Sequence, residues 1–521
     1  MRGIVPQKVK GFRDISPNQN YLRQFIINRA EEVYKSFGFS RLDTPILEYA
    51  ECLGKYLPDA DSVAQGVYSF KNPEQEPVYD TKGKEMRDAE NKVVMENHYL
   101  AMRYDLTAPL ARVYAESLWQ QHLRNEIQGK TNLFRRYQYG PVFRFEAKLD
   151  PGRFREFWQM DFDSVGVEDV AADAENCMIL STALENIGLK RGTYRIKINN
   201  RKIVNGLLSY AGITGAEEEM AVMRIIDKLD KIGAENVAAE LGKGRVDEVS
   251  GAQIQGLNLS DNHIKLIMEF IKEFEKLGNR KDVLAKLASK PAAQNPIYKE
   301  GLDELEKIDT ILASLGYDET VAVIDPGMVR GLGYYTGPIY EVESLQTYID
   351  EKGRERRVGS ICGGGRYDGL VENLLGVKVP ATGASIGVDR LAELLTLTGQ
   401  TPENQQSAVI IVVFDDNLMP LYQKTAADLR KNGINTEIYY GAKRGLKHQM
   451  AYADKNNCPI AVIIGEDEAK KGTATIKNLK LGKILADKIA DKNEWKAKVQ
   501  KEVELSCLAQ KIKEELTIEN N

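Results

Sequence analysis

Three patterns in the 521-residue sequence predict an α+β protein with a helical insertion and a C-terminal α/β domain. Residues 132–165 alternate between apolar and polar side chains, as two antiparallel strands joined by a short turn do. Residues 212–315 switch to helical periodicity rich in Lys, Glu, Leu and Ile. After a polar break at residues 398–407, strand and helix patterns alternate, which predicts a small domain with a largely parallel sheet.

The composition indicates a soluble globular protein of several domains. Apolar residues make up 43% and charged residues 28% of the chain, which argues against wholesale disorder. No apolar run approaches the roughly 20 residues that span a bilayer. The five cysteines stand singly, which excludes a standard zinc module and favours a reducing, cytoplasmic compartment. Because the net charge is −5, a nucleic-acid partner must meet a local basic patch.

The N-terminal part predicts a helix followed by extended chain. Ser16 can cap the helix, Pro17 suits its first turn, and Gly38 ends it. The next segment is extended, with Pro45 confined to a sheet edge or a bulge. Residues 71–98 are polar and rich in turn formers, so we expect them on the surface.

The strand pair within 132–165 has one face for packing and one face for binding. In its second strand Trp158, Met160 and Phe162 share the packed face. The opposite face carries, at alternate positions, Phe157, Gln159, Asp161 and Asp163. A solvent-facing polar strand would show the same pattern. The functional alternative is a pocket floor that offers an amide and a carboxylate to a small polar ligand.

A nucleotide site in this chain needs side-chain cations, because no phosphate-binding loop is intact. The sequence Gly129-Lys130-Thr131 resembles the end of such a loop, but Arg124 stands where a glycine is required. The glycines that follow Cys362 are as typical of a tight strand-to-helix turn as of a phosphate-binding loop. Residues 135–155 hold six cations and two anions. Arg144 lies mid-strand among aromatic residues, where a bound phosphate would satisfy its guanidinium; a solvated arginine face is the alternative.

Several stretches together resemble the class II aminoacyl-tRNA synthetases and, within that class, the histidyl-tRNA synthetase family. The class motifs are similar to KGFRDISP with the helix and strand up to Pro45, to GPVFRFEAKLDPGRFREFWQMDFD, and to GASIGVDRL. Two further segments, RGLGYYTGPIYEV and GGGRYDGL, resemble those peculiar to the histidine-specific family. The segments LKHQMAYADK and VIIGEDE resemble an anticodon-binding domain. The resemblance covers nearly the whole chain.

This resemblance implies a catalytic core with a mixed, mostly antiparallel sheet flanked by helices. The core would be divided into residues 1–211 and 316–400 by a helical insertion at 212–315. Residues 405–521 would form the anticodon-binding domain. The first motif forms a dimer interface in the family, so a homodimer is expected. Clamping of the tRNA acceptor stem is the family expectation for the insertion.

The resemblance also implies a role for each matching site residue. Arg144 would bind the ATP α-phosphate, and Arg330 would lie beside it, where related enzymes more often use an extra metal ion. The remaining ATP-binding residues would be Glu146 and Phe157 on the adenine side and Arg153 and Arg390 on the outer phosphates. The residues around the amino acid would be Asp105, Thr107, Gln159, Asp163, Arg330, Tyr334, Tyr335 and Tyr367.

Two positions depart from the family pattern. Gly333 stands where the more familiar pattern R-G-L-D-Y-Y has aspartate, which changes the local hydrogen bonding of that loop. The sequence Asp105-Leu106-Thr107 replaces the Glu-Gly-Thr of many members, so the anion is retained with a shorter reach.

The activity implied is ATP-dependent formation of histidyl-adenylate and transfer of histidine to the 3′ end of tRNA(His), with release of diphosphate and AMP. Mg²⁺ would be bound mainly through the ATP phosphates, without a dedicated protein metal site. No membrane partner is expected. Three alternatives differ in their sequence requirements. A non-catalytic regulatory paralogue would lack the phosphate-binding arginines, an enzyme for another amino acid would lack the tyrosine pair, and an accessory tRNA-binding protein would lack the arginine set.

The role that the resemblance implies for Arg330 generates a prediction. Replacing Arg330 with alanine removes a permanently charged donor beside the phosphate under attack. We expect turnover to fall by roughly 10²–10³, as for loss of one preorganised oxyanion donor, while ATP binding changes little. Steady-state kinetics and ATP binding measured on the same variant check this. An equal loss of affinity and rate would identify a simple binding residue.

Overall fold

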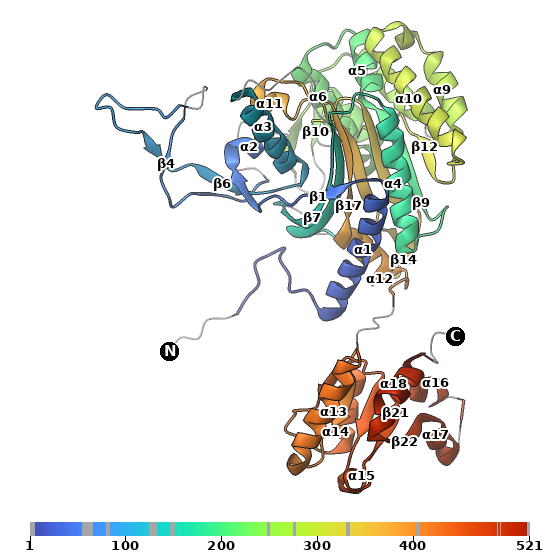
Figure 1. Ribbon diagram of the computed structural model, residues 1–521. Helices are drawn as coiled ribbons and strands as arrows, with labels where there is room; N and C mark the ends of the chain where they lie inside the picture. Colours follow the sequence, from blue (N-terminus) through green and yellow to red (C-terminus); the bar gives the residue numbers. More distant parts are fainter. Residues whose placement is uncertain are drawn as a thin grey trace. The chain divides into compact units, whose positions relative to one another are not determined.

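The computed structural model divides into two compact units, Met1–Thr401 and Pro402–Asn521, which are described separately (Figure 1). The residues that the structure describes are 6–54, 66–79, 84–123, 133–145, 152–246, 251–274, 278–329, 334–402, 407–486, 488–489 and 491–517. Arg330, Gly333 and Glu146 lie outside them. None of the helices within these ranges is long and apolar enough to cross a membrane.

The first unit is built on an eight-stranded sheet in the order β1-β7-β8-β17-β16-β13-β9-β12. The pairs β1–β7 and β9–β12 are parallel and the other five are antiparallel. This confirms the mixed, mostly antiparallel sheet expected for the core. The strands are β1 (Ser40–Arg41), β7 (Phe134–Phe143), β8 (Glu156–Val165), β9 (Tyr194–Asn200), β12 (Ala322–Ile324), β13 (Pro338–Ser344), β16 (Ser360–Arg366) and β17 (Ala381–Gly387).

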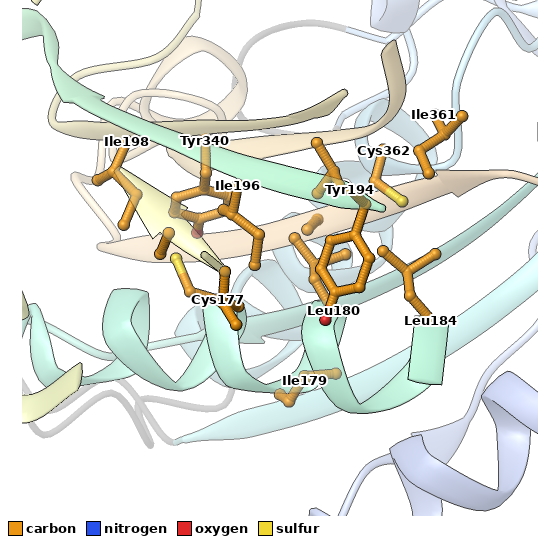
Figure 2. Close-up of a cluster of buried hydrophobic side chains, with 14 of the residues drawn as sticks. Cys177, Ile179, Leu180, Leu184, Tyr194, Ile196, Ile198, Tyr340, Ile361 and Cys362 are labelled. Atoms are coloured by element: carbon orange, nitrogen blue, oxygen red, sulfur yellow. The ribbon is translucent and has the colours of Figure 1, made fainter. Parts of the chain in front are cut away.

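Helices cover one face of this sheet. Leu180 and Leu184 of helix α4 (Ala171–Ile187) lie beneath β9. From β9, Tyr194 and Ile196 point toward this helix (Figure 2). Helix α1 (Pro17–Ser36) packs on α4 and on α12 (Val388–Leu397). As expected, Ser16 caps α1 by accepting from the backbone N–H of Gln19.

The face opposite these helices carries the polar side chains of β8. Strands β7 and β8 form the expected antiparallel hairpin, with Gly140 opposite Gln159. Met160 and Phe162 are fully buried in the core, so the intervening residues of β8 point the other way. The alternating pattern therefore identified the two faces correctly.

The described residues between 66 and 102 form a surface excursion with small sheets of its own. Strand β6 pairs with both β2 and β3, and β4 pairs with β5. Tyr79 and Met95 are 57% and 45% exposed, in agreement with the surface position expected for residues 71–98. The elements here are β2 (Leu47–Tyr49), α2 (Ala50–Gly54), β3 (Ser69–Lys71), β4 (Glu76–Pro77), β5 (Met95–Glu96) and β6 (Tyr99–Met102), and α3 (Thr107–Leu123) follows.

The described part of residues 212–315 is mainly helical, as its periodicity predicts. Its elements are α6 (Ala216–Ile226), α7 (Leu229–Leu241), β10 (Gly244–Val246), β11 (Gln253–Gln255), α8 (Asp261–Phe274), α9 (Arg280–Ala288), η1 (Pro291–Gln294) and α10 (Pro296–Ser314). Helix α10 packs on α4 and on α5 (Arg201–Tyr210), and its Leu305 and Ile308 belong to the main core. The bounds of a separate insertion therefore stay a prediction.

The remaining elements of the first unit are short. They are the strand pair β14 (Thr347–Ile349) and β15 (Glu355–Arg357) and the helix α11 (Glu372–Leu375).

The second unit has a five-stranded sheet in the order β19-β18-β20-β21-β22. Strand β18 is parallel to β19 and β20, but β21 is antiparallel to both of its neighbours. The expected largely parallel sheet is therefore wrong for the β21–β22 edge. Residues 464–472, which join β20 to β21, are fewer than the dozen or more that a parallel crossover needs.

The helices of this unit pack around its sheet as an α/β arrangement. The strands are β18 (Val409–Val412), β19 (Thr436–Ile438), β20 (Ile460–Ile463), β21 (Thr473–Asn478) and β22 (Gln500–Glu504). The helices are η2 (Asp416–Leu418), α13 (Met419–Lys431), α14 (Leu446–Lys455), α15 (Glu466–Lys471), α16 (Leu479–Ala486), α17 (Lys492–Val499), η3 (Leu505–Cys507) and α18 (Leu508–Thr517).

The two units have separate hydrophobic cores, which predicts that each responds to its own core substitutions. Leu180 of α4 and Ile411 near the end of β18 are both fully buried, so truncation of either to alanine should cost about 2–5 kcal/mol locally. Native-state hydrogen–deuterium exchange should rise in α4 and β9 for Leu180→Ala and in β18 and β20 for Ile411→Ala. Leu315→Ala, at a position 54% exposed, is the control. Faster exchange in both units from either variant would contradict the division.

Candidate active site

A cavity of about 340 Å³ lies on the polar face of the large sheet. Every sequence-predicted site residue within the described ranges lines it. These residues are Asp105, Thr107, Arg144, Arg153, Phe157, Gln159, Asp163, Tyr334, Tyr335, Tyr367 and Arg390. They come from five separate stretches of the chain, which the fold brings together.

The floor of the cavity is β8, whose side chains are held by neighbouring strands. Gln159 donates through Nε2 to the Ser385 hydroxyl on β17 at 2.7 Å. Its Oε1 atom is buried and makes no hydrogen bond within the protein. Asp161 lines the cavity between Gln159 and Asp163 and is 2% exposed. Asp161 and Ser385 were not among the predicted site residues, although the alternation of β8 placed Asp161 on the correct face.

The carboxylate of Asp163 is held from two sides. The hydroxyl of Tyr367 donates to its Oδ1 at 2.5 Å, and Arg136 Nη2 lies 3.1 Å from its Oδ2. Burial raises the pKa of Asp163, while Arg136 and Tyr367 act to lower it. Gly383 on β17 makes this packing possible, because a Cβ there would lie 2.2 Å from the Asp163 Oδ1 atom.

Arg136 joins this floor to the loop before α3. Its side chain is fully buried, and besides pairing with Asp163 it donates to the Leu106 carbonyl at 2.6 Å. Leu106 stands between two residues of the cavity wall, Asp105 and Thr107. Arg136 therefore fixes the distance between two walls of the site. The sequence placed it instead among cations available to a phosphate.

The two carboxylate oxygens of Asp105 differ: one accepts hydrogen bonds at the start of α3, and the other makes none within the protein. Its Oδ1 accepts from the backbone N–H groups of Thr107 at 3.2 Å and Ala108 at 2.9 Å. Its Oδ2 is buried and has no hydrogen-bond partner within the protein. Burial raises the pKa of Asp105, an effect that the Ala108 N–H and the charge of Arg144 reduce.

Three tyrosines form the wall beside Asp163. The ring of Tyr334 lies 4.9 Å from that of Tyr335 and 5.9 Å from that of Tyr367, each in an edge-to-face arrangement. Burial raises the pKa of all three phenols, so they remain neutral donors at physiological pH. Gly365 gives Tyr335 its space, because a Cβ there would lie 2.8 Å from that ring.

The other end of the cavity carries arginines. Arg144 donates through Nε to the Tyr104 carbonyl at 2.8 Å and lies over the Phe157 ring at 5.3 Å. Arg390 donates to the Ser360 carbonyl at 2.6 Å, and Arg153 lines the same cavity. A guanidinium has five N–H donors, so one bond to a carbonyl leaves Arg144 able to bind an anion.

Two arginines of the β7–β8 hairpin are placed differently from what the sequence indicated. Strand β7 ends at Phe143, so Arg144 follows the strand instead of lying within it; this position lets its Nε reach the Tyr104 carbonyl. Arg135 does not face the cavity, because it pairs with Glu175 at 2.5 Å and lies over the Phe39 ring. Arg155 similarly lies over Phe145.

Asp389, at the start of α12, ties the N-terminal segment to the floor of the site. It accepts from the Trp158 backbone N–H at 2.5 Å, pairs with Arg23 at 3.1 Å and also contacts Arg13. Burial lowers the pKa of Arg13, although Asp389 acts to raise it. This link was not anticipated from sequence. Among the described residues, no group of three or more His, Cys, Asp or Glu is arranged to hold a metal ion.

The Arg136–Asp163 pair predicts a large cost for removing one partner. Arg136→Met leaves the buried Asp163 carboxylate without its counter-ion and should destabilise the first unit by about 3–5 kcal/mol. The double variant with Asp163→Asn should recover part of this loss. Urea unfolding of both variants checks the coupling. The neighbouring Arg135→Met, which breaks a partly exposed pair, should cost about 1 kcal/mol or less; equal costs for Arg135 and Arg136 would contradict the argument.

Comparisons with known proteins agree with this geometry. Residues 11–391 match the histidyl-tRNA synthetase family model, and residues 406–515 match the anticodon binding domain. The chain is 43% identical over 506 residues to a protein named histidine–tRNA ligase from Paracoccus denitrificans, covering 97% of this chain and 96% of that protein. It is 42% identical over 508 residues to the ligase of the same name from Ruegeria pomeroyi, with the same coverage.

Among solved structures, histidyl-tRNA synthetase from Nostoc sp. PCC 7120 has a similar fold. The TM-score is 0.68 at 30% identity, covering 98% of this chain and 100% of that one. The family model and the full-length relatives cover both the cavity and the second unit. The chain therefore belongs to the histidyl-tRNA synthetase family.

Proposed function

We propose that this protein activates L-histidine with ATP and transfers the histidyl group to the 3′ end of tRNA(His). Diphosphate leaves in the first step and AMP in the second. One observation carries the proposal: a single cavity presents arginines at one end and buried carboxylates with tyrosines at the other. Such a cavity suits two substrates, of which one is strongly anionic and the other carries an ammonium and a polar ring.

The activation step requires positioning and charge neutralisation. The histidine carboxylate attacks the α-phosphate of ATP, a P–O bond forms, and diphosphate leaves with the electrons of the broken P–O bond. No side chain needs to transfer a proton. Arg144 is placed to bind both anions near the point of attack, because it stays protonated and binds oxygens through paired donors. Arg330 is proposed to lie beside the same phosphate.

The rest of ATP is assigned to the arginine end of the cavity. Phe157 offers its ring to the adenine, with Glu146 as its proposed companion, and Arg153 and Arg390 face the outer phosphates. Mg²⁺ would be held mainly by those phosphates and would neutralise part of their charge. Glu341 lines the same cavity and supplies a carboxylate of the kind that Mg²⁺ accepts beside phosphate oxygens, so the residues present fit this ion.

Histidine is assigned to the carboxylate end. Neutral imidazole presents one donor and one acceptor, which the Tyr367–Asp163 pair and the other two tyrosines can match. Asp105 is proposed to hold the α-ammonium, with Thr107 and Gln159 around the backbone atoms. A site whose buried polar groups stay unpaired with the wrong amino acid can discriminate by about 10⁴–10⁵.

The second unit is proposed to bind the anticodon stem and loop of tRNA(His). Lys443 and Lys447 are exposed next to the start of α14, where cations can meet phosphates. Arg444 uses part of its hydrogen-bonding capacity within the protein, because it pairs with Asp416 at 3.0 Å and donates to the Tyr439 carbonyl. A homodimer is proposed by analogy with the family.

The test is ATP–pyrophosphate exchange measured with each amino acid separately. Exchange should occur with histidine alone, because only its side chain satisfies both the phenol and the carboxylate at that end of the cavity. Transfer of labelled histidine to tRNA(His) tests the second step. Exchange with no amino acid would exclude the enzyme, and exchange with a different one would exclude the substrate assignment.

A further inference from the structure

We infer that Asp161 is a substrate-binding residue that holds the α-ammonium group of histidine together with Asp105. This inference rests on the proposed function and deepens it. It concerns a residue outside the predicted set, in the middle of the β8 floor. The carboxylates of Asp105, Asp161 and Asp163 all line the cavity, and each residue is 2% exposed.

The first step is that the three carboxylates are unequally satisfied by the protein. Asp163 pairs with Arg136 and accepts from Tyr367. Each of the three carboxylates has one buried oxygen without a hydrogen-bond partner within the protein, namely Asp105 Oδ2, Asp161 Oδ1 and Asp163 Oδ2, but only that of Asp163 lies against a guanidinium, at 3.1 Å from Arg136. Buried carboxylate oxygens without partners are costly, and a cation bound between them removes that cost.

The second step is the position of Asp161 along the strand. Gln159, Asp161 and Asp163 succeed one another on one face at about 7 Å intervals. The arginine end lies beside Gln159, since Arg144 lies over Phe157, and the tyrosine end lies beside Asp163. A histidine with its carboxylate toward Arg144 and its ring toward Tyr367 therefore brings its Cα and ammonium over Asp161.

The third step concerns the electrostatic environment of the Asp161 carboxylate. Burial, together with the nearby Asp163 carboxylate, raises the pKa of Asp161 to about 7, against the effect of Arg136. The hydroxyl of Ser385 accepts from Gln159 and hydrogen-bonds Asp161, which lowers that pKa only in part. The protein alone therefore does not provide a full counter-charge, and an incoming ammonium would supply it.

The experiment compares three ligands in Asp161→Asn and in the unaltered protein. L-Histidinol keeps the ammonium and the ring but lacks the carboxylate; 3-(imidazol-4-yl)propionate keeps the ring and the carboxylate but lacks the ammonium. Calorimetry should show that Asp161→Asn weakens histidine and histidinol about 10- to 100-fold, the loss of one charged hydrogen bond, and leaves imidazolylpropionate and ATP nearly unchanged. Asp163→Asn is the matched control and should weaken all three ring-bearing ligands.

Protein stability separates a binding role from a structural one. Asp161→Asn has nearly the same shape and removes a buried charge, so the ligand-free variant should unfold at the same temperature or higher. Equal weakening of all three ligands, a lower unfolding temperature with weaker ATP binding, or no change in histidine affinity would each overturn the inference. No exchange with histidine by the unaltered protein would overturn the proposed function, and this inference with it.

Discussion

The site depends on one buried ion pair. Arg136 has no exposed surface, yet it carries a permanent charge, so its position is dictated by the oxygens that surround it. Those oxygens belong to Asp163 on β8, to the Leu106 carbonyl in the loop before α3, and to Gln138 on its own strand. One guanidinium thus sets the separation of the floor from the wall that carries Asp105. Such a pair adds little net stability, but its geometry is demanding, and this is what a precise site requires.

The charges of the cavity follow the order of residues along β8. Arg144 lies over Phe157 at one end of this strand, and the carboxylate of Asp163, bonded to Tyr367, lies at the other. This separation orients a bound amino acid without a conformational change, because the carboxylate and the ammonium of the amino acid are attracted in opposite directions. The buried phenols complete the carboxylate end with neutral donors. The same low polarity that strengthens these interactions makes each unmatched group costly, so affinity and selectivity have one physical origin.

Much of this arrangement could be predicted from sequence, and the failures have physical reasons. Alternation along residues 156–165 identified the floor, because side chains of a strand change face at every residue. Arg136 was counted only as one of the six cations of residues 135–155, because a charge in a sequence does not reveal its partner. Alternation in the sequence puts Arg136 and Arg144 on the same side, and only the fold shows that Arg136, within β7, meets Asp163 while Arg144, just past its end, meets the Tyr104 carbonyl. Asp389 was missed for the same reason, since its partners are more than 200 residues away.

The tyrosines of the site also explain why glycines surround them. Bulky rings and buried carboxylates can meet on a sheet only if the neighbouring strands have glycine or a small residue at the positions that face them. Gly365 leaves space for the Tyr335 ring, and Gly383 leaves space for the Asp163 carboxylate. Glycine weakens a strand by itself. Here β16 and β17 lie inside an eight-stranded sheet, with α4 packed against its other face, so the neighbours supply the order that the glycines do not. A glycine-rich strand beside buried aromatic residues therefore indicates a binding surface. The stability that its glycines lose is offset by the surrounding strands of the sheet.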